Sequence, residues 1–232
     1  MEEKKKKPVF TENRIEVIVA VLLSITALCT AWASWISSLH GGNQATNYTV
    51  SNNLSADGNE CYTSATRQLN ADMITWNQIT ELSLNSAYAE EKGDTDVVEK
   101  NDYMLEQIMT NNCSPEFLDA VNWALEQGGD ASPFDKEGFV DSYYEEAQSI
   151  LAESEEKLEE GKLDNANGDR YGLVSVFYSL VLFLLGIVGT FKNLPNRVAI
   201  MIISAILFTL VTVFMVTIPL PTGFNLFSYF GG

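Results

Sequence analysis

Long apolar stretches alternate with polar sequence along this 232-residue chain. They cover residues 15–39, 171–191 and 198–218, and the second and third contain no ionisable side chain other than tyrosine. A helix needs about 20 apolar residues to cross a bilayer. The pattern therefore predicts three transmembrane helices, because helices in a soluble core rarely run so long without a charge.

The polar segment between the first and second apolar stretches, residues 40–170, is predicted to be helical. Residues 60–91 place apolar side chains at alternating three- and four-residue steps, which is typical of one face of a helix. The predicted face consists of Tyr62, Ala65, Leu69, Met73, Trp76, Ile79 and Ser83. The preceding residues 42–58 are rich in Asn, Ser and Thr, so they are either a linker or the irregular start of this helix.

Turn and capping signals divide the rest of the polar segment. Residues 93–96 break the first helix, and Thr95 is the expected N-cap of the second. Ser114 and Pro115 are typical of the start of a third helix. A last helix, with apolar positions over residues 140–158, is expected to continue into the second transmembrane segment. The result is a helical hairpin rooted in the membrane at both ends.

Basic residues set the predicted orientation in the membrane. Residues 4–7 are all lysine and Arg14 follows them, while Lys192 and Arg197 lie in the short link between the last two spans. By the positive-inside rule, both basic segments face the cytoplasm. We therefore expect a multi-pass protein of the cell membrane with these segments: a cytoplasmic tail, residues 1–14; an extracytoplasmic domain, residues 40–170; a cytoplasmic loop, residues 192–197; and an extracytoplasmic tail, residues 219–232.

The amino-terminal segment also resembles a cleavable secretory signal. A lysine-rich start is followed by an apolar run and by Ala31-Trp32-Ala33, which matches the small-residue pattern of a cleavage site. The apolar run is longer than the usual 7 to 15 residues, roughly, of such a signal. An uncleaved membrane anchor is the favoured interpretation.

The predicted extracytoplasmic domain is strongly acidic. Residues 40–170 contain 11 Asp and 16 Glu against 5 Lys and 2 Arg, a balance of −20, whereas the whole chain carries −17. Such a domain would be repelled by phosphate backbones, so nucleic acid is excluded as a partner. A solvated acidic surface is favoured over a dedicated cation-binding role.

Cysteine positions agree with this placement. Cys29 lies inside the first span, whereas Cys61 and Cys113 lie in the extracytoplasmic domain, where disulfides persist. Cys61 and Cys113 are therefore the candidate disulfide pair, and two buried free thiols are the alternative.

No motif in the sequence points to catalysis, and we expect a non-enzymatic protein without a cofactor. His40 is the only histidine, and with distant cysteines it lacks the partners of a zinc site. We interpret it as a polar residue at the membrane interface. Residues 164–169 resemble a calcium loop, but Leu163 stands where the first carboxylate is needed, so no metal site is predicted.

Aromatic residues mark the same interface. Trp32 and Trp35 lie near the end of the first span, and Tyr171 starts the second, as is typical of aromatic belts. The tail after Pro219 is short and apolar. We expect it to lie in or near this interface.

Small residues recur along the first span at helical spacing and let helix backbones approach closely in lipid. This face consists of Ala20, Ser24, Ala27, Ala31, Ser34 and Ser38, and the neighbouring strip carries Thr26, Thr30, Ala33 and Ser37. We interpret the face as a helix-packing surface, either within the chain or between copies of it. The alternative is that it lines the pore of an oligomeric ion channel, with the acidic domain attracting cations to the mouth.

Several segments resemble a loosely defined group of uncharacterised prokaryotic three-span membrane proteins. They are Thr30-Ala31-Trp32-Ala33-Ser34-Trp35, Gly42-Asn43-Gln44, Ser114-Pro115-Glu116-Phe117, Trp123-Ala124-Leu125, Ser132-Pro133-Phe134 and Asn167-Gly168-Asp169-Arg170-Tyr171. The resemblance implies a helical extracytoplasmic domain between the first and second spans. It implies no activity.

The sequence therefore predicts an all-α membrane protein with three transmembrane helices and an acidic helical extracytoplasmic domain. Its expected role is that of a self-associating interaction or assembly component. The expected partners are the lipid bilayer, copies of the same chain and a second membrane or surface protein.

Overall fold

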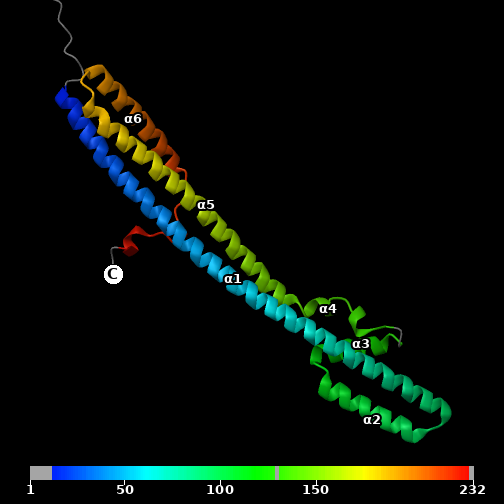
Figure 1. The fold of residues 1–232 in the computed structure, drawn as a ribbon. Coiled ribbons are helices and arrows are strands. Elements are labelled where there is room, and N and C mark those ends of the chain that lie inside the picture. Colours follow the sequence, from blue (N-terminus) through cyan, green and yellow to red (C-terminus); the bar gives the residue numbers. More distant parts are fainter. Residues whose placement is uncertain (1–11, 129–130, 230–232) are drawn as a thin grey trace, which may run out of the picture. The chain divides into compact units, whose positions relative to one another are not determined.

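The computed structural model describes residues 12–128 and 131–229, and in these ranges the chain is built from helices with no strand (Figure 1). The long helices are α1 (Glu12–Lys92), α2 (Thr95–Asn112), α3 (Pro115–Glu126), α5 (Glu145–Ile187) and α6 (Leu194–Val216). The short elements are η1 (Pro133–Asp135), α4 (Phe139–Ser142), η2 (Val188–Thr190) and η3 (Leu226–Tyr229). The predicted all-α fold is confirmed, and the lysines at positions 4–7 lie outside the described residues.

Three helices are long and apolar enough to cross a membrane, namely α1, α5 and α6. They contain the three apolar stretches of the sequence, so the prediction of three candidate spans is confirmed. In α1 the apolar stretch is only the first part of an 81-residue helix. In α5 it forms the last part, so the predicted continuation from polar sequence into the second span is also confirmed.

Helix α1 runs without a break through Gly41, Gly42 and the Asn-rich residues that follow. For residues 42–58 the sequence left two alternatives, a linker or an irregular start of the first outer helix. Both are wrong, because these residues lie inside the continuous helix α1. Glycine costs about 1 kcal/mol relative to alanine inside a helix. Packing on both sides of the pair offsets that cost, because His40 before it and Asn47 after it both contact Asp164.

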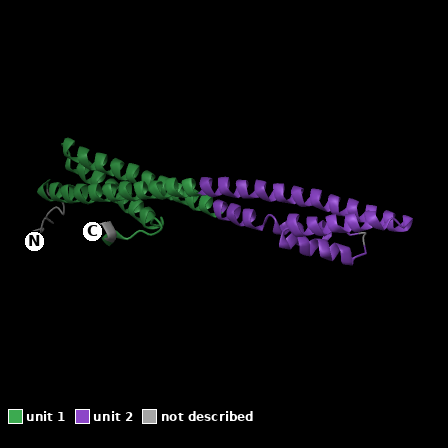
Figure 2. Ribbon diagram, turned by 90° about the horizontal axis from the view of Figure 1, so that it is seen from below, with its two compact units in different colours: residues 1–50, 156–232 green, residues 51–155 purple. Residues whose placement is uncertain are grey.

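The chain divides into two compact units, shown in different colours in Figure 2. Unit 1 comprises Met1–Val50 and Glu156–Gly232, and unit 2 comprises Ser51–Glu155. Helices α1 and α5 contribute residues to both units. The residues just beyond the first apolar stretch and just before the second thus group with the three candidate spans.

The core of unit 1 lies between α1, α5 and α6, which run side by side (Figures 1 and 2). Ala33 and Ile36 of α1 pack with Val174 and Tyr178 of α5 and with Val211 of α6. The Tyr178 hydroxyl lies 2.9 Å from Thr212 Oγ1, which joins α5 to α6 inside the apolar layer. A second cluster of buried residues, Ile15, Val188 and Met201, lies at the other end of the spans.

The core of unit 2 is built around Phe117. This ring is fully buried and stacks on Phe134 and Phe139 at centroid distances of 6.0 and 6.2 Å. Ser114 fixes the start of α3 as predicted, because its hydroxyl accepts a hydrogen bond from the Phe117 amide at 3.1 Å. The N-cap of α2 is Asp94 and not the predicted Thr95, since the Asp94 carboxylate accepts a bond from the Val97 amide.

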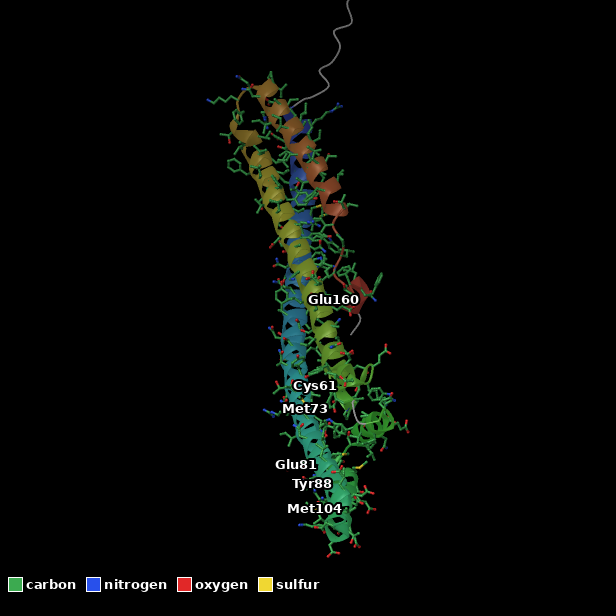
Figure 3. The ribbon with its side chains drawn as sticks, turned by 90° about the vertical axis from the view of Figure 1, so that its right-hand side faces the viewer. Cys61, Met73, Glu81, Tyr88, Met104 and Glu160 are labelled. Atoms are coloured by element: carbon green, nitrogen blue, oxygen red, sulfur yellow. The ribbon has the colours of Figure 1, made fainter. Side chains whose placement is uncertain are left out.

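The buried face of α1 in unit 2 differs from the predicted face. Ala65 and Ile79 are buried as expected, but Tyr62 and Met73 are about half exposed, and Asp72 is buried in their place. Met73 and Tyr88 are labelled on α1 in Figure 3. Asp72 lies seven residues after Ala65 and seven before Ile79, so it shares their helix face, and the hydrogen bond from the Tyr143 hydroxyl satisfies its buried carboxylate.

Candidate functional site

The small-residue face of the first span is exposed in its entirety. Helix α1 turns the opposite side toward α5 and α6, where Thr26, Ala33 and Ile36 are fully buried. The exposed face consists of Ala20, Ser24, Ala27, Ala31, Ser34 and Ser38. The packing within the chain therefore uses mainly the neighbouring strip and leaves most of the predicted small-residue face uncovered.

Helix α5 extends this face with small residues of its own. Ser34 Oγ lies 3.1 Å from Ser175 Oγ, which brings the two helices together at that level. Toward the opposite end of the spans, Ala20, Gly186 and Gly189 line a shallow hollow of about 380 Å³. Among the described residues, no heavy atom lies within 4 Å of a Cβ placed on Gly186 or Gly189, so the hollow is open beside both glycines.

A buried polar network lies at the ends of the spans where α1 leaves its apolar stretch. His40 Nδ1 is 2.7 Å from Asp164 Oδ1, and the Asn47 side-chain amide donates to Asp164 Oδ2 at 3.3 Å. The other ring nitrogen, Nε2, is 3.2 Å from the Pro219 carbonyl oxygen. The ring of Tyr171 stacks on His40, and its hydroxyl donates to the Ile218 carbonyl. We call these groups the His40 network.

The network ties the carboxy-terminal strap, residues 218–224, to α1. In addition to the Pro219 contact, the Asn43 amide donates to the Thr222 carbonyl at 3.4 Å. Phe224 packs edge-on against Trp32 and Trp35 at centroid distances of 6.0 and 5.8 Å. The interfacial aromatic residues predicted from the sequence thus hold the tail of the same chain.

His40 is not the partnerless interfacial residue that the sequence suggested. Its side chain is 1% exposed and pairs with the carboxylate of Asp164. In the sequence, Asp164 was considered only as part of a calcium loop, which was rejected. The predicted helical hairpin could have indicated this pair, because antiparallel pairing of α1 and α5 brings the residues just after the first span beside those just before the second. Among the described residues, no group of three or more His, Cys, Asp and Glu side chains is placed to hold a metal ion.

Unit 2 contains a buried carboxylate of its own. Asp72 is 1% exposed, and it accepts hydrogen bonds from the Tyr143 hydroxyl at 2.6 Å and from the Gln68 amide at 3.0 Å. Burial raises the pKa of Asp72 above its ordinary value, and the two hydrogen bonds only partly oppose this shift. Burial and the hydrogen bond to Asp72 raise the pKa of Tyr143 as well.

The two cysteines of unit 2 are free thiols in the structure. Burial and then the charge of Glu146 raise the pKa of Cys61, whereas burial and then the charge of Asp72 raise the pKa of Cys113. Cys113 packs against the Phe117 cluster. The charge of Asp72 acts on Cys113, and Asp72 lies eleven residues beyond Cys61 on α1, which corresponds to about 16 Å of helix. The two thiols therefore have different surroundings.

An open, mainly apolar hollow of about 810 Å³ lies between α2 and α3. Leu105 and Met109 of α2 face Pro115 and Leu118 of α3 across it, and Cys113 lies at its edge.

No protein-family model, curated protein or solved structure matches this chain.

We expect Asp72→Asn to stabilise unit 2 at neutral pH. A carboxyl group with a raised pKa binds its proton more tightly in the folded state, so it favours folding at low pH and opposes folding increasingly as pH rises from about 3.9 through its folded pKa. Asparagine removes this dependence and can still accept from Tyr143. The expected gain is about 1 kcal/mol, the free energy of a tenfold change in proton affinity.

Hydrogen exchange of the α3 amides in the full chain, at about pH 4 and about pH 7, measures this difference. The matched control is Asp57→Asn, an exposed aspartate on the same helix of unit 2. Equal effects of the two substitutions at both pH values would show that Asp72 has no special contribution.

Proposed function

We propose that this protein is a membrane component that associates with copies of itself through the small-residue face of α1. One observation carries the proposal: all six residues of that face are exposed, whereas Thr26, Ala33 and Ile36 on the opposite side of the same helix are fully buried. In lipid, small side chains at this spacing drive helix association by close backbone contact. Apart from the contact of Ser34 with Ser175 at the edge of the face, α5 and α6 pack on the other side of α1, so the face is available to a second copy.

The hydroxyl groups on this face favour packing over a water-filled pore. The Ser24 hydroxyl donates to the Ala20 carbonyl at 2.9 Å, so it needs no water or ion to satisfy it. Ser34 has its partner in Ser175. A pore lining would need polar groups directed at the permeating ion.

We further propose that unit 2 lies outside the cytoplasm and serves as an interaction domain. The basic residues around the first span and in the link before α6 support this orientation through the positive-inside rule. The apolar hollow between α2 and α3 supports an interaction role, because it offers a mainly apolar surface in an otherwise acidic unit. Its partner would be a membrane or surface protein.

Ala31→Leu is expected to weaken self-association by about tenfold or more. The larger side chain holds the two backbones apart, at a cost of about 1–3 kcal/mol. The measurement is the mass of the detergent-solubilised particle across a dilution series. Ala199→Leu is the matched control, since it makes the same change at an exposed position on α6. A wild-type particle that stays monomeric at every concentration would overturn the proposal.

Ion flux through liposomes separates this proposal from the channel. If wild type and Ala199→Leu conduct, and Ala31→Leu abolishes conduction without changing the particle mass, then the face lines a pore and the packing proposal is wrong. If Ala31→Leu changes the particle mass and none of the three proteins conducts, the face is a packing surface.

A further inference from the structure

The His40 network lies outside the proposed self-association face and has a chemistry that self-association does not use. Two acceptors face the two ring nitrogens of one buried imidazole. Asp164 Oδ1 is 2.7 Å from Nδ1, and the Pro219 carbonyl oxygen is 3.2 Å from Nε2. Both side chains are buried, with His40 1% and Asp164 7% exposed.

The donors and acceptors around the His40 ring determine how many protons the network needs. A neutral imidazole has one N–H donor and one acceptor nitrogen, and a carbonyl oxygen can only accept. The contact with Pro219 therefore needs the proton on Nε2, which leaves Nδ1 facing a carboxylate oxygen. That contact is a hydrogen bond only if a further proton lies between Nδ1 and Oδ1. The pair then has no net charge, whether it is written as imidazolium with carboxylate or as imidazole with carboxylic acid.

We propose that His40 and Asp164 form a proton-binding site that clasps the carboxy-terminal strap to α1. Removing the proton leaves a buried negative charge and one nitrogen that must face an acceptor without a donor. Both are costly away from water. The strap is the element that can move, because Pro219 lies beyond the end of α6. Its release breaks the Nε2 contact and frees Phe224 from Trp32 and Trp35.

The groups around His40 and Asp164 do not compete with this pair for the proton. On α1, Asn47 donates to Asp164 and is not titratable. On α5, the Tyr171 hydroxyl donates to the Ile218 carbonyl, and the charged residues of the adjacent turns, Lys162, Asp169 and Arg170, are exposed. The strap contributes the carbonyl oxygens of Ile218 and Pro219.

Hydrogen exchange of the strap amides in the full chain tests the clasp, over about pH 5 to about pH 9, which brackets the ordinary titration of histidine. After correction for intrinsic exchange rates, wild-type protection should fall by about tenfold or more as the proton is lost, since release of the strap breaks the hydrogen bond from His40 Nε2 to the Pro219 carbonyl. The amides of α6 serve as the internal reference. Because His40 is the only histidine, selective ¹⁵N labelling reports its ring protonation directly.

Two variants separate the clasp from simple packing. In Asp164→Asn the amide donates to Nδ1 and its oxygen accepts from Asn47, so the strap should stay protected at every pH. In His40→Leu no donor reaches Pro219, so protection should be low at every pH. The proposal is overturned if wild-type protection does not change while the ring titrates, if the ring does not titrate, or if Asp164→Asn keeps the wild-type pH dependence.

Discussion

Phe117→Ala should lower the free energy of unfolding of unit 2 by about 3–5 kcal/mol, as expected when a fully buried aromatic ring is truncated. The ring is 0% exposed and stacks on both Phe134 and Phe139. These partners come from η1 and α4, so the truncation removes the contact that joins them to α3. Since a small unit is stabilised by only a few kcal/mol in total, we expect much of unit 2 to unfold at ambient temperature.

Hydrogen exchange resolved to the amides of α2 and α3 in the full chain measures this loss. The control is Leu84→Ala, which removes a large side chain that is 66% exposed on α1 and should change stability by no more than about 0.5 kcal/mol. If α3 remains as protected in Phe117→Ala as in Leu84→Ala, the Phe117 cluster is not the core of unit 2.

Gly161→Ala should destabilise unit 1 by about 1–3 kcal/mol, the usual cost of overpacking a close contact. A Cβ on Gly161 would lie 2.5 Å from two ring carbons of Tyr48, so either the Tyr48 ring or the two helices α1 and α5 would have to shift. Thermal unfolding of the detergent-solubilised chain measures the effect. The helix propensity of alanine works in the opposite direction, by about 1 kcal/mol.

Gly42→Ala measures the contribution of helix propensity alone. Gly42 is exposed in the same unit, and no heavy atom lies within 4 Å of its added Cβ. It should stabilise the helix by about 0.5–1 kcal/mol. Adding Tyr48→Leu to Gly161→Ala should recover part of the loss, because the side chain that meets the new methyl group is smaller. Destabilisation that is unchanged in the double variant would contradict the close contact as its cause.

The architecture was predictable from the sequence wherever one contribution to the free energy of folding dominates. Three long apolar stretches, of which only the first contains a charged residue, Glu16, indicate the candidate spans. Ser114 with Pro115 indicates the start of α3. Each of these patterns has few alternative structures. Prediction was wrong where local and tertiary terms compete. Gly41 and Gly42 weaken a helix locally, yet α1 continues because His40 and Asn47 on either side both contact α5.

The candidate sites were predictable to different degrees. The small-residue face follows from spacing alone, but spacing does not say which side of α1 packs within the chain. The His40 network and the burial of Asp72 require partners from distant parts of the sequence. Hydrophobic periodicity assigned Met73 to the interior because it cannot register that Tyr143 satisfies the neighbouring carboxylate.

The contact between Asn47 and Asp164 has a consequence for sugar attachment. Asn47-Tyr48-Thr49 matches the acceptor triplet for N-linked glycans, and the nitrogen that would carry the sugar is the one that donates to Asp164. In a host that glycosylates surface proteins, a glycan on Asn47 would have to be attached before α1 and α5 pair, and would then hold the His40 network open. Asn53, in the triplet Asn53-Leu54-Ser55, is exposed and carries no such conflict.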